Sequence, residues 1–292
     1  LVAATPGLEL WTEATCLQAH TTASADGRRR LTGLTIEHEG RPERLAAGWY
    51  VDATADLAVA QSAGCAVAWG RESQDVYGEP SAPPEPEFKL NGWTLCFEAH
   101  PGPDRIALPE AGWGHAGDWA HLSELPDGGW NVNLVYQLSG EAGWRLGAEQ
   151  AREYLWRNVA RRWPRVRAAY GLEGFGITRL AARVGVREGP RLVGRYVLTE
   201  GDFRRGDWGR HHPDCVMWTD HALDRHAPDG GCSEAENGPV GVPLRCLLPR
   251  EVDNLAVACR GASFSSLAAS AVRLQVTMIG LGEAAARYIA GQ

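Results

Sequence analysis

The C-terminal forty residues constrain the fold of this chain more than any other part. Residues 253–258 (Asp-Asn-Leu-Ala-Val-Ala) form a short apolar run typical of a buried strand. A turn of small residues, 259–264, follows, and Ser265–Ala290 then predicts one helix of about 25 residues. Because this segment is apolar nearly all round, we expect the helix to be buried against a sheet, which favours an α/β fold.

A second apolar strand ends in small polar residues near the N-terminus. Residues 47–51 run into Asp52-Ala-Thr54, and a short helix is expected over 55–63, ending at Gly64. Before this strand, three segments alternate between apolar and polar residues and are separated by turn signals. They predict a three-stranded meander over residues 8–15, 31–38 and 44–46.

The middle of the chain differs in composition and predicts an inserted, mixed-sheet domain. Residues 72–89 are proline-rich and indicate a linker or surface excursion. A helix over 147–163 carries apolar residues four apart, and Pro164 is expected to end or kink it. The strands expected in this part are 93–99, 130–137, 177–186 and 191–198, followed by a loop rich in His, Asp and Trp over 206–236.

Composition and charge exclude several classes of protein. The net charge of −7 argues against a nucleic-acid partner, because nucleic-acid-binding domains are usually basic. Seven cysteines without a C-x-x-C pair indicate free thiols in a reducing cytoplasm. Neither a secretion signal nor an uninterrupted membrane span is evident, since Arg273 and Gln275 break the long C-terminal apolar run. We therefore expect a cytoplasmic protein with no membrane partner, of undetermined oligomeric state.

Two motifs suggest ligands but have simpler explanations. Residues 280–285 mimic G-x-G-x-x-A, yet a dinucleotide fingerprint follows a strand and opens a helix, whereas these glycines lie deep in a helical run and favour close helix packing. The loop over 211–226 holds His212, His221 and His226 with several Asp residues and Cys215. Zinc prefers such ligands, so a metal-dependent hydrolase is one alternative function. The spacing matches no standard site, and we expect no metal.

The polar break in the long C-terminal helix points to a partner inside the fold. Burying a charged side chain is costly unless the charge is paired. Arg273 and Gln275 therefore imply an anionic or carbonyl-rich group nearby. That group is either a ligand or an Asp or Glu of this chain in a buried ion pair, and the sequence leaves both open.

Several blocks of sequence, in order, resemble the C-terminal part of FAD-dependent oxidoreductases with a glutathione-reductase-like flavin fold. The resemblance extends from about residue 8 to residue 290. The blocks are Tyr50–Ala58 with Gly70–Glu72, Val186–Gly194 with Tyr196–Asp202, Leu248–Arg260, and Ser270–Gln275 with Gly280–Ala285.

The resemblance implies FAD as cofactor and a Rossmann-like, partial FAD-binding domain. That domain would comprise residues 1–70 and 240–292, with its meander and C-terminal strand and helix, and residues 71–239 would be the inserted substrate domain. The turns after the two apolar strands would meet over the ribityl chain, with the last helix directing its N-terminus toward the flavin pyrimidine edge. The implied cofactor-binding residues are Asp52, Thr54, Arg260, Ser263, Arg273 and Gln275.

The implied activity is hydride transfer from a small organic substrate to FAD. Arg187 and Glu188 are the candidate substrate-binding residues, because arginine suits carboxylates; a structural ion pair is the alternative. The catalytic group is unassigned, with His226, His212 and Arg187 as candidates.

Two features set the chain apart from the resembled family. The family opens with a strand and a Gly-rich turn that binds the FAD pyrophosphate, whereas this sequence opens with neither. Ala55 and Cys259 stand where the family has glycine. The alternative is therefore an N-terminally truncated or cofactor-free relic without activity of its own.

Overall fold

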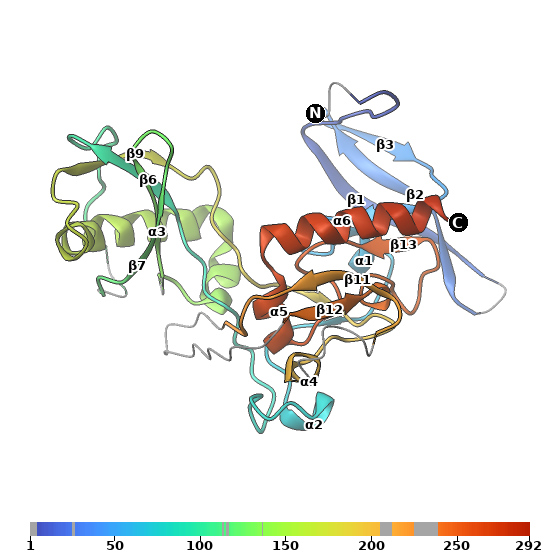
Figure 1. Ribbon diagram of the computed structural model, residues 1–292. Coiled ribbons are helices and arrows are strands. Elements are labelled where there is room, and N and C mark those ends of the chain that lie inside the picture. The colour runs from blue at the N-terminus through green and yellow to red at the C-terminus, as the bar shows by residue number, and fades with distance from the viewer. Residues whose placement is uncertain are drawn as a thin grey trace.

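The protein has a mixed α/β fold with two lobes, each built around its own hydrophobic core (Figure 1). The computed structural model describes residues 5–24, 27–112, 114, 117–135, 137–204, 212–224 and 239–292. One core is formed by residues within 93–186, which we call the sheet lobe. The other is formed by residues within 16–67 and 192–288, which we call the main lobe. The boundaries expected for an inserted domain, 71–239, stay a prediction.

The three-stranded meander is confirmed, but its first strand was predicted in the wrong place, at 8–15. Strands β1 (Ala14–Ala23), β2 (Arg29–His38) and β3 (Arg41–Leu45) form an antiparallel sheet in that order. The first strand does not begin at residue 8, because Leu8 and Leu10 are 53% and 64% exposed and find no core to face. Glu13, with φ +53°, also interrupts the extended backbone just before β1.

Two parallel strands form the centre of the main lobe. Strand β4 (Tyr50–Asp52) pairs with β13 (Leu255–Val257), and Asp52 lies opposite Val257. Both strands therefore end at the same edge, where β4 leads to α1 (Ala58–Ser62) and β13 leads to α5 (Ser266–Val272). Helix α1 starts three residues later than predicted, because Ala55 and Leu57 adopt left-handed φ values of +65° and +58°.

The prediction of one long C-terminal helix is wrong. The segment forms α5 and a second helix, α6 (Gln275–Ala290), because Leu274 is extended with ψ 149° and interrupts the helical backbone. Every residue of α5 is buried, as expected of an apolar helix. Helix α6 is buried on one side only, and its Val276 and Ile279 are 66% and 74% exposed.

The sheet lobe consists of one antiparallel sheet and two helical segments, joined by a kink at Gly147, that together carry the label α3 (Gly140–Ala169). The strand order is β7 (Ala120–Glu124), β8 (Trp130–Leu134), β6 (Phe97–Pro101) and β9 (Phe175–Leu180). Helix α3 packs Trp163 and neighbouring apolar side chains against the sheet (Figure 1). Pro164 lies inside α3 and does not end it. The helical backbone is interrupted at Gly147 instead, where φ is +76°.

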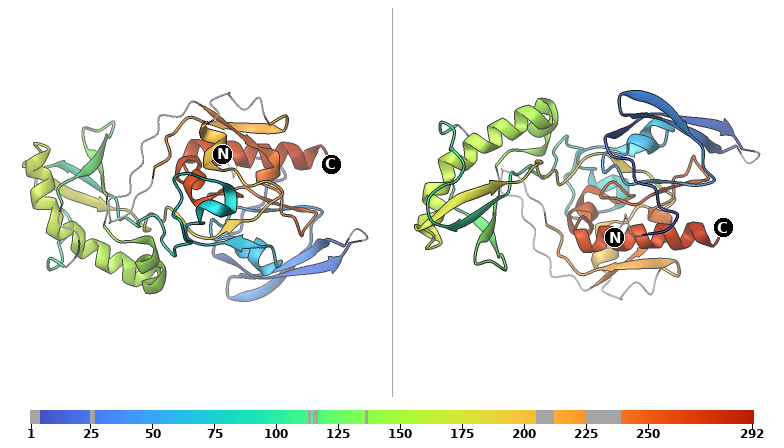
Figure 2. Two further views of the ribbon diagram at one scale, coloured as in Figure 1. Left: turned by 90° about the horizontal axis from the view of Figure 1, so that it is seen from below. Right: turned by 90° about the horizontal axis from the view of Figure 1, so that it is seen from above.

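Short elements complete the main lobe. They are β5 (Val67–Ala68), α2 (Gln74–Tyr77), β10 (Arg191–Leu192), α4 (Glu200–Arg204), β11 (Cys215–Thr219), β12 (Val240–Pro243) and the 3₁₀ turn η2 (Leu244–Cys246). Strand β10 pairs with β5, and β11 pairs with β12 alongside α6 (Figure 2). The strands predicted over 177–186 and 191–198 are therefore shorter than expected. None of the described helices has the length and apolar character needed to cross a membrane.

Candidate active site between the lobes

Asp52 and Thr54 shape the turn that follows β4. Asp52 is fully buried; its Oδ1 accepts hydrogen bonds from the backbone N–H and the hydroxyl of Thr54, at 3.0 and 2.7 Å. Its Oδ2 accepts from the N–H of Ala60 at 2.8 Å, and Thr54 Oγ1 accepts from the N–H of Ala58 at 2.9 Å. Both side chains therefore satisfy N–H groups at the start of α1 and fix the turn.

The turns after β4 and β13 lie against each other, as the sequence predicted. Gly261 lies so close to buried Leu57 that a Cβ at this glycine would approach within 2.8 Å of the leucine side chain. Arg260 Nη2 forms an ion pair with Asp56 Oδ1 at 2.5 Å, which also joins the two turns. Ser263 is buried, and its hydroxyl accepts from the N–H of Gly194 at 2.9 Å, so it anchors the second turn.

A pocket of about 220 Å³ lies where the main lobe meets the sheet lobe. Arg260 and Arg273 line it from the main lobe, and Arg187 lines it from the sheet lobe. Its other lining residues are Thr94, Asn133, Gly185 and Val186. The fold thus brings together three of the predicted site residues that the sequence assigned to separate roles. We call this cavity the arginine pocket.

Each guanidinium of the arginine pocket is held by identifiable contacts. Arg187 Nη1 donates to the carbonyl of Gly92 at 2.7 Å, and its Nη2 lies 3.4 Å from Asn133 Oδ1. Arg273 Nη2 lies 3.3 Å from Asp224 Oδ2. Of the two partners that the sequence left open for Arg273, a ligand or an acidic residue of this chain, the acidic residue is therefore present.

Glu188 occupies a different place from its neighbour Arg187. Its side chain is 3% exposed, and Oε1 accepts from Arg191 at 2.6 Å and from the hydroxyl of Ser266 at 2.9 Å. Oε2 accepts from the backbone N–H and the side-chain amide of Asn91, both at 2.9 Å. The structure therefore places Glu188 in a buried ion pair, which was the alternative to a substrate contact.

The N-terminus of α5 is surrounded by carboxylates of this chain. The N–H of Ser266 donates to Glu72 Oε2 at 3.0 Å, and the hydroxyl of Ser265 donates to Glu79 Oε1 at 2.6 Å. Burial raises the pKa of Glu79 above its ordinary value. The helix end that was expected to face a flavin ring thus has its first N–H bonded to a carboxylate of this chain. Glu72 was not among the predicted site residues, although it belongs to the block Gly70–Glu72 that carried the resemblance.

The remaining predicted site residues lie elsewhere. Gln275 is exposed at the first position of α6 and is not among the lining residues of the arginine pocket. His212 is buried, with Nε2 3.1 Å from Asp202 Oδ1 and its ring against Tyr196. His226 lies outside the described residues. Within the described ranges, no group of three or more metal-binding side chains converges; His221 instead pairs through Nδ1 with the carbonyl of Ala222.

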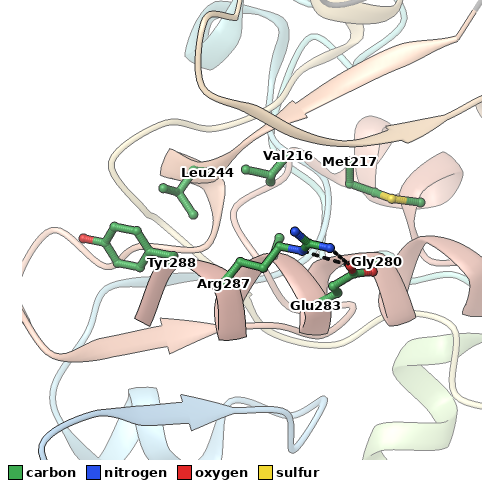
Figure 3. A pocket seen from close by; sticks show the side chains of 8 residues that line it. Val216, Met217, Leu244, Gly280, Glu283, Arg287 and Tyr288 are labelled. Atoms are coloured by element: carbon green, nitrogen blue, oxygen red, sulfur yellow. Dashed lines mark hydrogen bonds and ion pairs between the residues drawn. The ribbon is translucent and has the colours of Figure 1, made fainter. Parts of the chain in front are cut away.

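A larger, mostly apolar pocket of about 550 Å³ lies between α6 and β11 (Figure 3). Glu283 and Arg287 line it but pair with each other at 2.7 Å. Gly280 faces it, and a Cβ at this position would collide with the side chain of Met217. This glycine therefore allows α6 to pack closely on β11, in agreement with the packing explanation of the G-x-G-x-x-A string. The pocket shares no lining residue with the arginine pocket.

Comparison with known proteins identifies the family. A family model described as "FAD dependent oxidoreductase" matches residues 1–291. No curated protein and no solved structure matches the chain. Because the match extends over nearly the whole sequence, the family predicted from the blocks of sequence is confirmed. The chain belongs to the FAD-dependent oxidoreductases, and its cofactor is FAD.

Proposed function

We propose that this oxidoreductase transfers a hydride from a small organic substrate to FAD, and that the reaction takes place at the arginine pocket. One observation carries the proposal. Arg260 and Arg273, expected to bind the cofactor, and Arg187, expected to bind the substrate, line the same cavity between the lobes. Ligand sites often lie at such junctions, where two parts of a fold supply different groups.

The residues of the pocket fit the flavin end of FAD. When bound, FAD accepts two electrons and a hydrogen from the substrate, and negative charge develops on the pyrimidine side of its ring. Arg260 and Arg273 offer fixed cationic N–H donors for that charge. The cavity, at about 220 Å³, is below the usual range for whole ligand sites, so it suits a ring edge and a small substrate.

Three other predicted cofactor residues would act through the backbone. Asp52 and Thr54 hold the first turn, and Ser263 holds the second, so that Asp56 and Arg260 meet across the gap. These three are positioning residues in this proposal. None of the seven described residues that line the pocket carries a carboxylate, imidazole or thiol, so a group outside this lining accepts the proton that leaves the substrate.

A titration of the purified protein with FAD tests the proposal. Bound flavin is followed by its visible absorbance and by the quenching of its fluorescence. A hydrogen bond to a charged group contributes about 1.5–3 kcal/mol, so Arg260→Gln and Arg273→Gln are each expected to weaken FAD binding about ten- to a hundredfold. Arg260→Lys retains the charge and is expected to lose less.

The control is Arg287→Gln, which removes a 79% exposed arginine paired with Glu283 on α6. It is expected to bind FAD like the wild type, and circular dichroism checks that each variant is folded. If the wild-type protein takes up no flavin at saturating FAD, the proposal is wrong for this chain. Unchanged FAD affinity in folded Arg260→Gln and Arg273→Gln variants would remove the pocket from the flavin site.

A further inference from the structure

The lining of the arginine pocket is unusual in its charge. Three guanidinium groups face about 220 Å³ of space, and none of the seven described lining residues is acidic. Thr94 and Asn133 add a hydroxyl and an amide, and Val186 adds the one branched apolar side chain. Such a lining is complementary to a small anion with a short apolar part.

Two of the arginines already bind carboxylates in the structure. Arg260 is paired with Asp56, whose side chain is 55% exposed, and Arg273 is paired with Asp224. Guanidinium groups bind carboxylate oxygens through parallel N–H donors, so the charge and shape of this site match that group. Asp56 is largely exposed, so its pair with Arg260 contributes little to stability. Since the proposed function assigns Arg260 and Arg273 to the flavin, Arg187 is the arginine of the pocket left for a substrate carboxylate.

Arg187 presents its guanidinium from the opposite lobe in a fixed position. Its contacts to the Gly92 carbonyl and to Asn133 restrict the side chain before any ligand arrives. A restrained arginine loses less conformational entropy on binding than a free one, which favours affinity. We therefore infer that the substrate of this oxidoreductase is a small organic acid, whose carboxylate is bound by Arg187 in the arginine pocket.

This inference rests on the proposed function and narrows it to one class of substrate. Under the proposed function the cavity of about 220 Å³ must also admit the edge of the flavin ring, which limits the acid to a small molecule. A protonated amine without a carboxylate would meet no acidic group among the seven described lining residues, since Asp56 and Asp224, which pair with Arg260 and Arg273, are not part of that lining. A neutral substrate would displace water from the guanidinium groups without offering them an opposite charge, and this desolvation costs free energy.

Calorimetric titration of the FAD-loaded protein tests the inference without relying on turnover. The probes are acetate, lactate, succinate and benzoate, with the neutral amide succinamide and inorganic phosphate as comparisons. At least one carboxylate is expected to bind the wild-type protein, and succinamide is not. Arg187→Gln is expected to weaken that binding about ten- to a hundredfold, and Arg187→Lys less, because lysine retains the charge but not the planar fork.

The matched control is Arg157→Gln, which removes an exposed arginine of α3 that is paired with Glu153 and lies outside the pocket. It is expected to bind the carboxylate like the wild type. Thermal unfolding verifies that Arg187→Gln is folded, and Arg187→Lys supplies the second measurement if it is not. Failure of all four carboxylates to bind, tighter binding of phosphate, or equal binding by wild type and both Arg187 variants would each overturn the inference.

The two proposals fail separately. If FAD binds and depends on Arg260 but no carboxylate binds, the inference about the substrate is wrong and the flavin site stands. The same titration on the protein without FAD covers the opposite case: if a carboxylate binds through Arg187 but the protein takes up no FAD, the anion site stands and the proposed hydride transfer does not.

Discussion

Replacing Glu188 by Gln separates a structural from a substrate-binding role at this position. The change retains the shape of the side chain and removes one charge of a buried ion pair. Glu188 and Arg191 are 3% and 1% exposed, and 2.6 Å separates their paired atoms. The sequence gives Glu188 two possible roles, and the contacts predict that the variant loses stability rather than substrate affinity.

The size of the expected loss of stability depends on the charge of Arg191 and on the carboxylate that still pairs with it in the variant. Burial alone would lower the pKa of Arg191, but the carboxylates of Glu188 and Glu72 raise it, so the arginine stays charged. Removing one partner of a buried pair costs about 3–5 kcal/mol. Because Glu72 still lies 2.7 Å from Arg191, we expect the lower end, about 3 kcal/mol.

Urea unfolding, followed by circular dichroism, measures this loss. The control is Glu98→Gln, which removes a carboxylate paired with the 73% exposed Arg179, and it is expected to cost less than about 1 kcal/mol. The reasoning is refuted if Glu188→Gln unfolds within about 1 kcal/mol of the wild type while KM for the substrate rises. That result would place Glu188 at the substrate.

Three further predictions concern stability. Burial raises the folded pKa of Glu79, so the stability that its protonated form contributes is present below the unfolded value of 4.5 and is lost as pH rises through the folded pKa. Glu79→Gln should therefore gain stability relative to the wild type as the pH rises above 4.5, measured by urea unfolding at a series of pH values; a difference that does not vary with pH would contradict this. Ala55→Gly should stabilise the protein by up to about 1.5 kcal/mol, because relief of the left-handed conformation (about 1–2 kcal/mol) exceeds the added chain entropy (about 0.5–1 kcal/mol). A lower melting temperature would contradict this. Gly282→Ala should stabilise α6 by about 0.5–1 kcal/mol, since a Cβ at this position meets nothing within 4 Å. Gly280→Ala should not give this stabilisation, because its Cβ would collide with the side chain of Met217. Equal melting temperatures of the two variants would refute the packing role of Gly280.

The meeting of the two strand ends was predictable from sequence because it depends on local patterns. Each apolar run is followed by small polar residues, and parallel strands place their carboxyl ends at one edge of a sheet. Asp52 and Val257 are therefore opposite each other although they are far apart in the chain. The meander was predictable for the same reason, since its turns and alternation are local.

The break in the C-terminal helix and the carboxylates around α5 were not predictable from local patterns. Hydropathy shows that residues 265–290 are apolar, but it does not show that Leu274 is extended. The ion pair between Glu72 and Arg191 joins residues 119 positions apart, and no periodicity encodes such a contact. The three arginines of the pocket come from different segments for the same reason, and only the fold brings them together.

An arginine that is paired with buried carboxylates stabilises the fold, whereas an arginine that lines a cavity can bind a ligand. Arg187 and Arg191 are four positions apart and of the same type, so sequence alone cannot assign them different roles. Arg191 is enclosed with two carboxylates, and exchanging either for a ligand would incur the large cost of disrupting a buried pair. Arg187 instead lines a cavity, and its contacts include the neutral Gly92 carbonyl and the neutral Asn133 amide. This difference is the basis for proposing substrate recognition at Arg187 and a structural role for Arg191.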